Sequence, residues 1–163
     1  MEKCCEQAIK EDRTKRREYE QRLQVGFEYQ DFVMEHLYDK YKFRLLCYSS
    51  MKYQKKRGES MNGWEIKYDN IMKSTGNLFI ETEEKRGYNQ EEYVAAGIYK
   101  KDNTVVYAIG DYNELYIFNL DVLLKLHKDG VYEMKENAIS RARGFIISKE
   151  IAKQHARQVE VFE

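Results

Sequence analysis

With 163 residues, the chain is long enough for one domain that buries a proper core. Its 28 lysine and arginine residues balance its 28 aspartate and glutamate residues, which excludes a general attraction to nucleic acid or membranes and leaves only local basic patches. No window approaches the ~18 apolar residues of a membrane span, and the N-terminal stretch lacks a signal-peptide core. The odd number of cysteines, three, argues against a disulfide framework. We therefore expect a cytoplasmic protein with no membrane partner.

The first part of the chain predicts helix. Residues 1–24 are almost entirely charged and polar and predict a solvated helix or a frayed arm, with the helix favoured because no breaker occurs. After Gly26, apolar residues recur at three- and four-residue intervals through 27–41, which predicts a helix with one apolar face. Residues 42–50 are expected to form a buried strand, and the basic segment 51–60 a loop or short helix.

The rest of the chain predicts a block of strands followed by helix. The expected elements are a strand pair at 63–69 and 77–85, a second hairpin from 92–100 and 104–111, a strand or helix entry at 114–120, a helix closed by Gly130, and a last helix capped by Ser148. This order predicts one α+β, sandwich-like domain over residues 25–163, preceded by the arm 1–24.

The predicted strand pair concentrates charge. Alternation places Asp69 on one face of the first strand, and Glu81, Glu83 and Lys85 on one face of the second. With the turn centred on Thr75, Asp69 lies opposite Glu81, where Cβ atoms are only ~4.5–5.5 Å apart and like charges repel. A Mg²⁺ or Mn²⁺ ion between the carboxylates would remove this repulsion, and Lys85 could then orient a metal-bound water. The alternative is the solvated face of a two-sided sheet.

A helix, a strand ending in Asp, a turn and a strand bearing Glu-x-Lys together resemble the PD-(D/E)XK nuclease superfamily. The longer wording EIKYD…TGNLFIETEEK, followed by AAGIYKKDNTVVYAIGD, is similar to small phage and bacterial nuclease-like proteins of that superfamily, over roughly residues 26 to 120. The resemblance implies a restriction-endonuclease-like core, with a mixed sheet of four to six strands flanked by helices. It also implies Mg²⁺-dependent cleavage of DNA by a protein of a bacterial host cell or a phage.

The resemblance also implies roles for individual residues. Asp69 with Glu81, Glu83 or both would hold Mg²⁺ or Mn²⁺, and Lys85 would activate water. The Glu-x-Lys spacing nominates Glu83 and the register about Thr75 nominates Glu81, so both stay open. Where many members carry a second glutamate on the preceding helix, this chain has Gln30, a poor cation ligand, for which Glu28 or Asp31 could substitute.

Basic residues near the strand pair predict contacts to DNA phosphates. Lys52, Lys55, Lys56 and Arg57 lie just before it, with Tyr48 and Tyr53 interleaved, and Lys73 lies in its turn. We therefore expect a metal-dependent nuclease acting on DNA. The alternative is a catalytically weakened or inactive module of the same fold that binds DNA or a protein partner, and either can act as a homodimer.

Overall fold

The computed structural model describes residues 2–85, 90–130, 132–137 and 141–162, with side chains for all of these except 2–16 and Met51. The chain divides into two compact units, Met1–Phe43 and Arg44–Glu163. Each unit is described by itself. Within the described residues, no helix combines the length and the apolar character that crossing a membrane requires.

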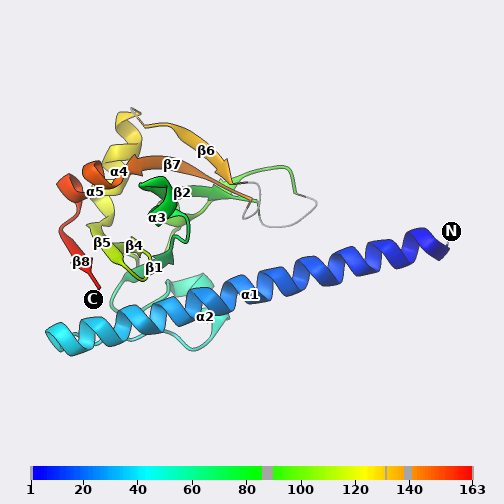
Figure 1. Ribbon diagram of the computed structural model, residues 1–163, viewed down its shortest axis with the longest axis horizontal. Helices are drawn as coiled ribbons and strands as arrows, with labels where there is room; N and C mark the ends of the chain where they lie inside the picture. The colour runs from blue at the N-terminus through cyan, green and yellow to red at the C-terminus, as the bar shows by residue number, and fades with distance from the viewer. Residues whose placement is uncertain (1, 86–89, 131, 138–140, 163) are drawn as a thin grey trace. The chain divides into compact units, whose positions relative to one another are not determined.

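The first unit consists of one helix, α1 (Glu2–Tyr41), so the predicted arm and the predicted amphipathic helix are a single element (Figure 1). Gly26 does not interrupt it, because a glycine inside a helix costs only about 1 kcal/mol relative to alanine. The predicted boundary between residues 24 and 25 therefore falls inside α1. The helix ends where Lys42 adopts a left-handed conformation (φ 54°), with its N–H donating to the Tyr38 carbonyl at 2.8 Å.

The second unit contains two four-stranded sheets (Figure 1). The first, in the order β1-β4-β5-β8, is mixed: β1 and β4 are parallel, and the other neighbours are antiparallel. Its strands are β1 (Trp64–Tyr68), β4 (Val106–Gly110), β5 (Glu114–Asn119) and β8 (Gln158–Val161). The second sheet, in the order β3-β2-β7-β6, is antiparallel throughout. Its strands are β3 (Val94–Ala95), β2 (Asn77–Glu84), β7 (Ala142–Ser148) and β6 (Met134–Asn137).

The helix α2 (Met51–Arg57) precedes β1, and four short helices lie between strands: α3 (Met72–Thr75), the 3-10 helix η1 (Gly97–Tyr99), α4 (Leu120–Asp129) and α5 (Lys149–His155). Two predicted helix ends are confirmed. Gly130 closes α4 in a left-handed conformation, and the Ser148 hydroxyl accepts the Ile151 N–H at 3.3 Å at the start of α5. The segment 114–120 is both a strand and a helix entry, since β5 leads directly into α4.

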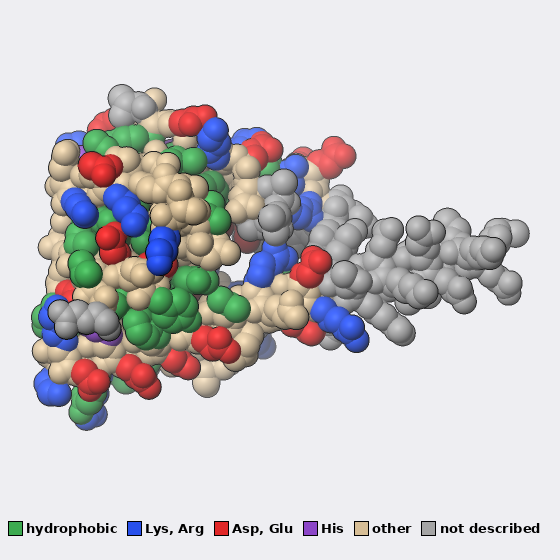
Figure 2. All heavy atoms as spheres, viewed as in Figure 1, with side chains coloured by type: hydrophobic (Ala, Val, Ile, Leu, Met, Phe, Trp, Pro, Cys, Tyr) green, Lys and Arg blue, Asp and Glu red, His purple; other side chains and the backbone are tan. Residues whose placement is uncertain are grey.

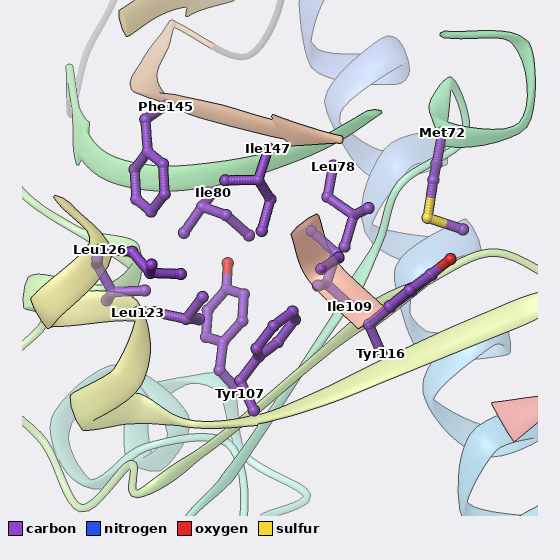
Figure 3. Packing of buried hydrophobic residues seen from close by; sticks show 13 residues of the cluster. Met72, Leu78, Ile80, Tyr107, Ile109, Tyr116, Leu123, Leu126, Phe145 and Ile147 are labelled. Atoms are coloured by element: carbon purple, nitrogen blue, oxygen red, sulfur yellow. The ribbon is translucent and has the colours of Figure 1, made fainter. Parts of the chain in front are cut away.

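The core of the second unit lies between its two sheets (Figure 3). Tyr107 and Ile109 of β4 lie beside Phe118 and Tyr116 of β5 in register, so all four share the inner face of the first sheet. The inner face of the second sheet supplies Leu78, Ile80, Phe145 and Ile147, and the helices supply Met72, Leu123, Leu126 and Ala152. This two-layered packing confirms the predicted α+β class.

The predicted pairing of 63–69 with 77–85 is wrong. β1 pairs in parallel with β4, and β2 pairs with β7 and β3, so the two strands belong to different sheets. The cause lies in the connection. Residues 72–75 form the helical turn α3 instead of a tight turn, and this carries the chain from one sheet to the other.

Two further strand predictions are wrong. Residues 92–100 contribute only the two-residue β3 and then η1, since Gly97 (φ 49°) brings the backbone against β2 in a conformation that favours glycine. Residues 42–50 form no strand, only an isolated bridge between Cys47 and Ser60. Instead of one mixed sheet of four to six strands, the described residues form two four-stranded sheets, of which β1-β4-β5-β8 is mixed.

Candidate functional site: a buried glutamate–lysine cluster

Asp69, the first predicted metal ligand, is occupied by the backbone. Its Oδ1 accepts the N–H groups of Ile71 (3.2 Å) and Met72 (3.1 Å), and its Oδ2 accepts the N–H of Phe79 at 3.1 Å. The carboxylate thus ties the end of β1 to the start of α3 and to β2. Burial raises the pKa of Asp69, although the three N–H donors act in the opposite direction. This environment is that of a structural carboxylate that organises the chain crossing.

Glu81 and Glu83, the two alternative ligands, have different surroundings. Opposite β7, Glu81 pairs with Gly144 and Glu83 with Arg143, so Thr82 is an extra residue in β2. Such a bulge shifts the alternation of side chains by one residue. Burial raises the pKa of Glu81, the charge of Lys67 lowers it, and the negative charge of Glu84 raises it further.

Glu83 and Lys85 instead belong to a solvent-facing group around Tyr93. An oxygen of Glu83 lies 3.5 Å from Arg143, whose guanidinium lies 4.1 Å from the centre of the Tyr93 ring. The Lys85 ammonium lies 4.7 Å from the same ring centre. Arg143 also binds Glu136 at 2.7 Å. Glu83 and Lys85 thus share one group of contacts, whereas the recorded partners of Asp69 are backbone N–H groups.

A different group of acidic residues surrounds Lys67 on β1. The Lys67 ammonium lies 2.6 Å from Glu65 Oε1 and 3.2 Å from Glu59 Oε1. Glu59 Oε2 in turn accepts the Ile66 N–H at 2.8 Å, which provides a partner for this N–H group on the free edge of β1. In register with β4, Glu65 lies beside Tyr107 and Lys67 beside Ile109. Both charged side chains therefore lie on the inner face of the sheet, at the margin of the hydrophobic core.

Glu65 is the most unusual member of this group. The residue is only 2% exposed, and no described donor reaches its Oε2. Burial raises the pKa of Glu65 despite the neighbouring Lys67 ammonium. Burial acts on Lys67 in the opposite sense, but the carboxylates of Glu65 and Glu59 outweigh it and leave the pKa of Lys67 well above its usual range.

Glu81 completes this group from the other sheet. Burial raises the pKa of Glu81, and the positive charges of Lys67 and Lys100 lower it. The fields of Glu65 and Glu81 also reach the phenol of Tyr107, whose pKa is raised first by burial and then by Glu65. We call Glu59, Glu65, Lys67 and Glu81 the β1 cluster.

The sequence contained a signal for the β1 cluster. Glu65-Ile66-Lys67 is a Glu-x-Lys tripeptide, like Glu83-Glu84-Lys85, and it lies on a strand. The expected pairing of 63–69 with 77–85 points to the second tripeptide only. Pairing of β1 with β4 instead turns Glu65 and Lys67 toward the core.

The remaining predicted site residues lie on helices. Glu28 and Gln30 are on α1, in the first unit, and are described only as part of that helix. Lys52, Lys55, Lys56 and Arg57 are exposed on α2, and Lys73 is exposed on α3. On the face of the molecule drawn in Figure 2, basic and acidic side chains are interspersed with hydrophobic ones.

The β1 cluster contains three carboxylates beside one lysine. Carboxylate oxygens are the ligands that Mg²⁺ and Mn²⁺ prefer, and the buried Glu65 Oε2 lacks a donor among the described residues. As the described side chains lie, no three His, Cys, Asp or Glu residues form a ready-made metal group, since Lys67 stands between the carboxylates.

Comparisons with family models, curated proteins and solved structures find no match to this chain.

Proposed function

We propose that this protein is a metal-dependent nuclease that hydrolyses phosphodiester bonds of DNA, with the β1 cluster as its active site. The observation that carries the proposal is the buried Glu65 carboxylate, with one oxygen on Lys67 and the other without a donor among the described residues. A buried charge of this kind costs free energy unless a cation or hydrogen bonds offset it, and such groups concentrate at functional sites.

Three features support a restriction-endonuclease-like core of the PD-(D/E)XK type. A mixed four-stranded sheet carries Glu65 and Lys67 of the cluster, these two belong to a Glu-x-Lys tripeptide on its edge strand β1, and helices accompany the sheets. In this reading Glu65-Ile66-Lys67 takes the place that the sequence alone assigned to Glu83-Glu84-Lys85.

Each residue of the β1 cluster would have its own role in the reaction. Glu65 and Glu81, with Glu59, would hold Mg²⁺ or Mn²⁺, which when bound supplies charge neutralisation and acidifies a water molecule. Lys67 would donate a hydrogen bond to the attacking water or to the phosphate oxygen that gains negative charge. Lys100, which pairs with Asp102 at 2.9 Å and whose charge also acts on Glu65 and Glu81, would add attraction for the anionic substrate.

The two Glu-x-Lys tripeptides provide matched variants for the test. Glu65→Gln and Lys67→Met are compared with Glu83→Gln and Lys85→Met, using cleavage of labelled DNA in Mg²⁺ or Mn²⁺ and metal binding by calorimetry. We expect the first pair to lower cleavage by about 10²-fold or more, as loss of a group that stabilises developing charge does. The second pair should cleave at close to the rate of the unmodified protein.

The reverse pattern would move the site to the second tripeptide. Absence of both cleavage and metal binding in the unmodified protein would remove the nuclease altogether. One observation favours the second function, a non-catalytic module that binds DNA or a protein: Lys67 already neutralises Glu59 and Glu65 without a metal ion. That function predicts binding that survives EDTA and survives Glu65→Gln.

A further inference from the structure

We propose that α2 and the residue that stacks on it form a binding surface for single-stranded nucleic acid, which delivers the strand to the β1 cluster. The α2 surface consists of Tyr48, Lys52, Tyr53, Lys55, Lys56 and Arg57. That the strand is delivered for cleavage rests on the proposed function. The binding itself can be measured without cleavage.

The first observation is an exposed aromatic platform. The rings of Tyr48 and Tyr53 stack with centroids 6.0 Å apart and an interplanar angle of 21°. Tyr53 is 56% exposed, so this large ring is held in place while much of it meets solvent. Stacking on a base is sequence-tolerant, because every base presents a flat face, and it requires a base that is not paired within a duplex.

The second observation is a concentration of positive charge around that platform. The seven-residue helix α2 contains four cations and no acid, although the whole chain has a formal net charge of +0. Tyr53, Lys56 and Arg57 are spaced by three and four residues and so share one side of the helix. None of the four cations forms an ion pair with a described side chain.

A purely structural role accounts for only part of this charge. Lys55, Lys56 and Arg57 lie in the last turn, where cations interact favourably with the helix dipole. Lys52 and Lys56, however, are like charges at i and i+4, which destabilise a helix. An anionic ligand that follows the helix would remove the repulsion, and the phosphate backbone of a nucleic acid is such a ligand.

The third observation is that the α2 surface is joined to the proposed active site. The Tyr48 N–H donates to the carbonyl of Glu59 at 3.1 Å, and the Gln54 amide donates to the Tyr48 carbonyl at 2.6 Å. Lys100, which acts on Glu65 and Glu81, also donates to the Gln54 carbonyl at 3.4 Å. A strand stacked on Tyr53 would therefore run close to Glu59 and Lys100.

The test measures binding of the full chain to fluorescently labelled oligonucleotides by anisotropy, in EDTA to prevent cleavage. The ligands are single-stranded DNA, single-stranded RNA and duplex DNA of equal length, which also shows whether the sugar matters. We expect either single strand to bind at least tenfold more tightly than the duplex. Equal or tighter binding of the duplex would overturn the proposal.

Variants separate stacking from charge. Tyr53→Ala should weaken single-strand binding by about tenfold or more, because one base–aromatic stack is lost, whereas Tyr53→Phe keeps the ring and should bind within about twofold of the unmodified protein. Tyr112, 42% exposed on another part of the unit, provides the matched control Tyr112→Ala. The double variant Lys55→Ala/Lys56→Ala should reduce the slope of log K against log salt by about 1.4, or ~0.7 for each phosphate contact.

The outcomes distinguish this proposal from the nuclease proposal. Single-strand binding without metal-dependent cleavage would overturn only the nuclease, and cleavage with no loss of binding in Tyr53→Ala would overturn only the α2 surface. Circular dichroism checks that each variant is folded. Should Tyr53→Ala not fold, an unchanged salt slope in the lysine double variant is sufficient to overturn the proposal.

Discussion

At the scale of single residues, burial and partners decide what each carboxylate does. Asp69 is 7% exposed and Glu65 is 2% exposed, yet their surroundings differ. Three backbone N–H groups surround Asp69, and these would be left unsatisfied by its removal. Glu65 has one lysine and one oxygen with no described donor, an arrangement that contributes little to folding and can accept a ligand.

The raised pKa of Glu65 predicts how stability depends on pH. A carboxyl group whose pKa is higher in the folded than in the unfolded state keeps its proton longer when folded, so it lowers stability as pH rises from the ordinary carboxyl range through the folded-state pKa. Glu65→Gln removes this contribution. We therefore expect thermal unfolding between pH 4 and 8 to show a flatter decline of stability with pH in this variant.

Lys67→Met provides the opposite change for the same measurement. It removes the cation that lowers the pKa of Glu65 while the burial of Glu65 remains. The decline of stability with pH should therefore become steeper. Identical pH profiles for the two variants would show that Glu65 is not the group that titrates.

At the scale of elements, a bulge in β2 and the close contact of η1 with β2 position Glu81. The bulge at Thr82 places Glu81 and Glu83 in different surroundings. Directly beside it, Gly97 has φ 49°, and a Cβ at this position would lie 2.1 Å from the carbonyl oxygen of Glu81. The close approach of η1 to β2 thus requires a glycine, and it holds the backbone of a proposed metal ligand.

Gly97→Ala tests this close approach. We expect it to lower the free energy of unfolding by about 3 kcal/mol, from left-handed strain together with overpacking against backbone. Gly76 is the control: it is also left-handed (φ 68°), but nothing lies within 4 Å of its Cβ position. Gly76→Ala should cost only about 1 kcal/mol. If urea unfolding gave equal losses of unfolding free energy for the two variants, the contact with Glu81 would not contribute to stability.

At the scale of the whole molecule, the division into two units has a direct consequence for folding. Every member of the hydrophobic cluster lies between Met72 and Ala152, within the second unit. That unit therefore contains its own two-layered core.

A shortened chain of residues 44–163 should consequently fold without the first unit. We expect a single cooperative thermal transition and a far-ultraviolet circular dichroism spectrum richer in strand than that of the full chain. A chain that shows no cooperative transition would contradict this. Metal affinity, measured on both chains, then tests Glu28 and Gln30: a loss confined to the shortened chain would assign the first unit a part in the site.

The sequence by itself determined the features that depend on neighbours within a few residues. The helical character of α1, the cap at Ser148, the stop at Gly130 and the α+β class all follow from spacing and local hydrogen bonding. The sequence also predicts that charged strands with Glu-x-Lys tripeptides carry the chemistry, and this stays a prediction. These signals are local because helix and cap bonds join residues three or four apart.

Only the tertiary structure decided which strands pair, and pairing decided which carboxylates meet. Alternating strands can satisfy their hydrogen bonds with many partners, so neither the parallel pairing of β1 with β4 nor the bulge in β2 could be read from spacing. With that pairing, the side chains of Glu65 and Lys67 point inward, and the Asp69 carboxylate accepts hydrogen bonds from backbone N–H groups. The candidate site moved from the second tripeptide to the first because side-chain direction in a strand depends on long-range register.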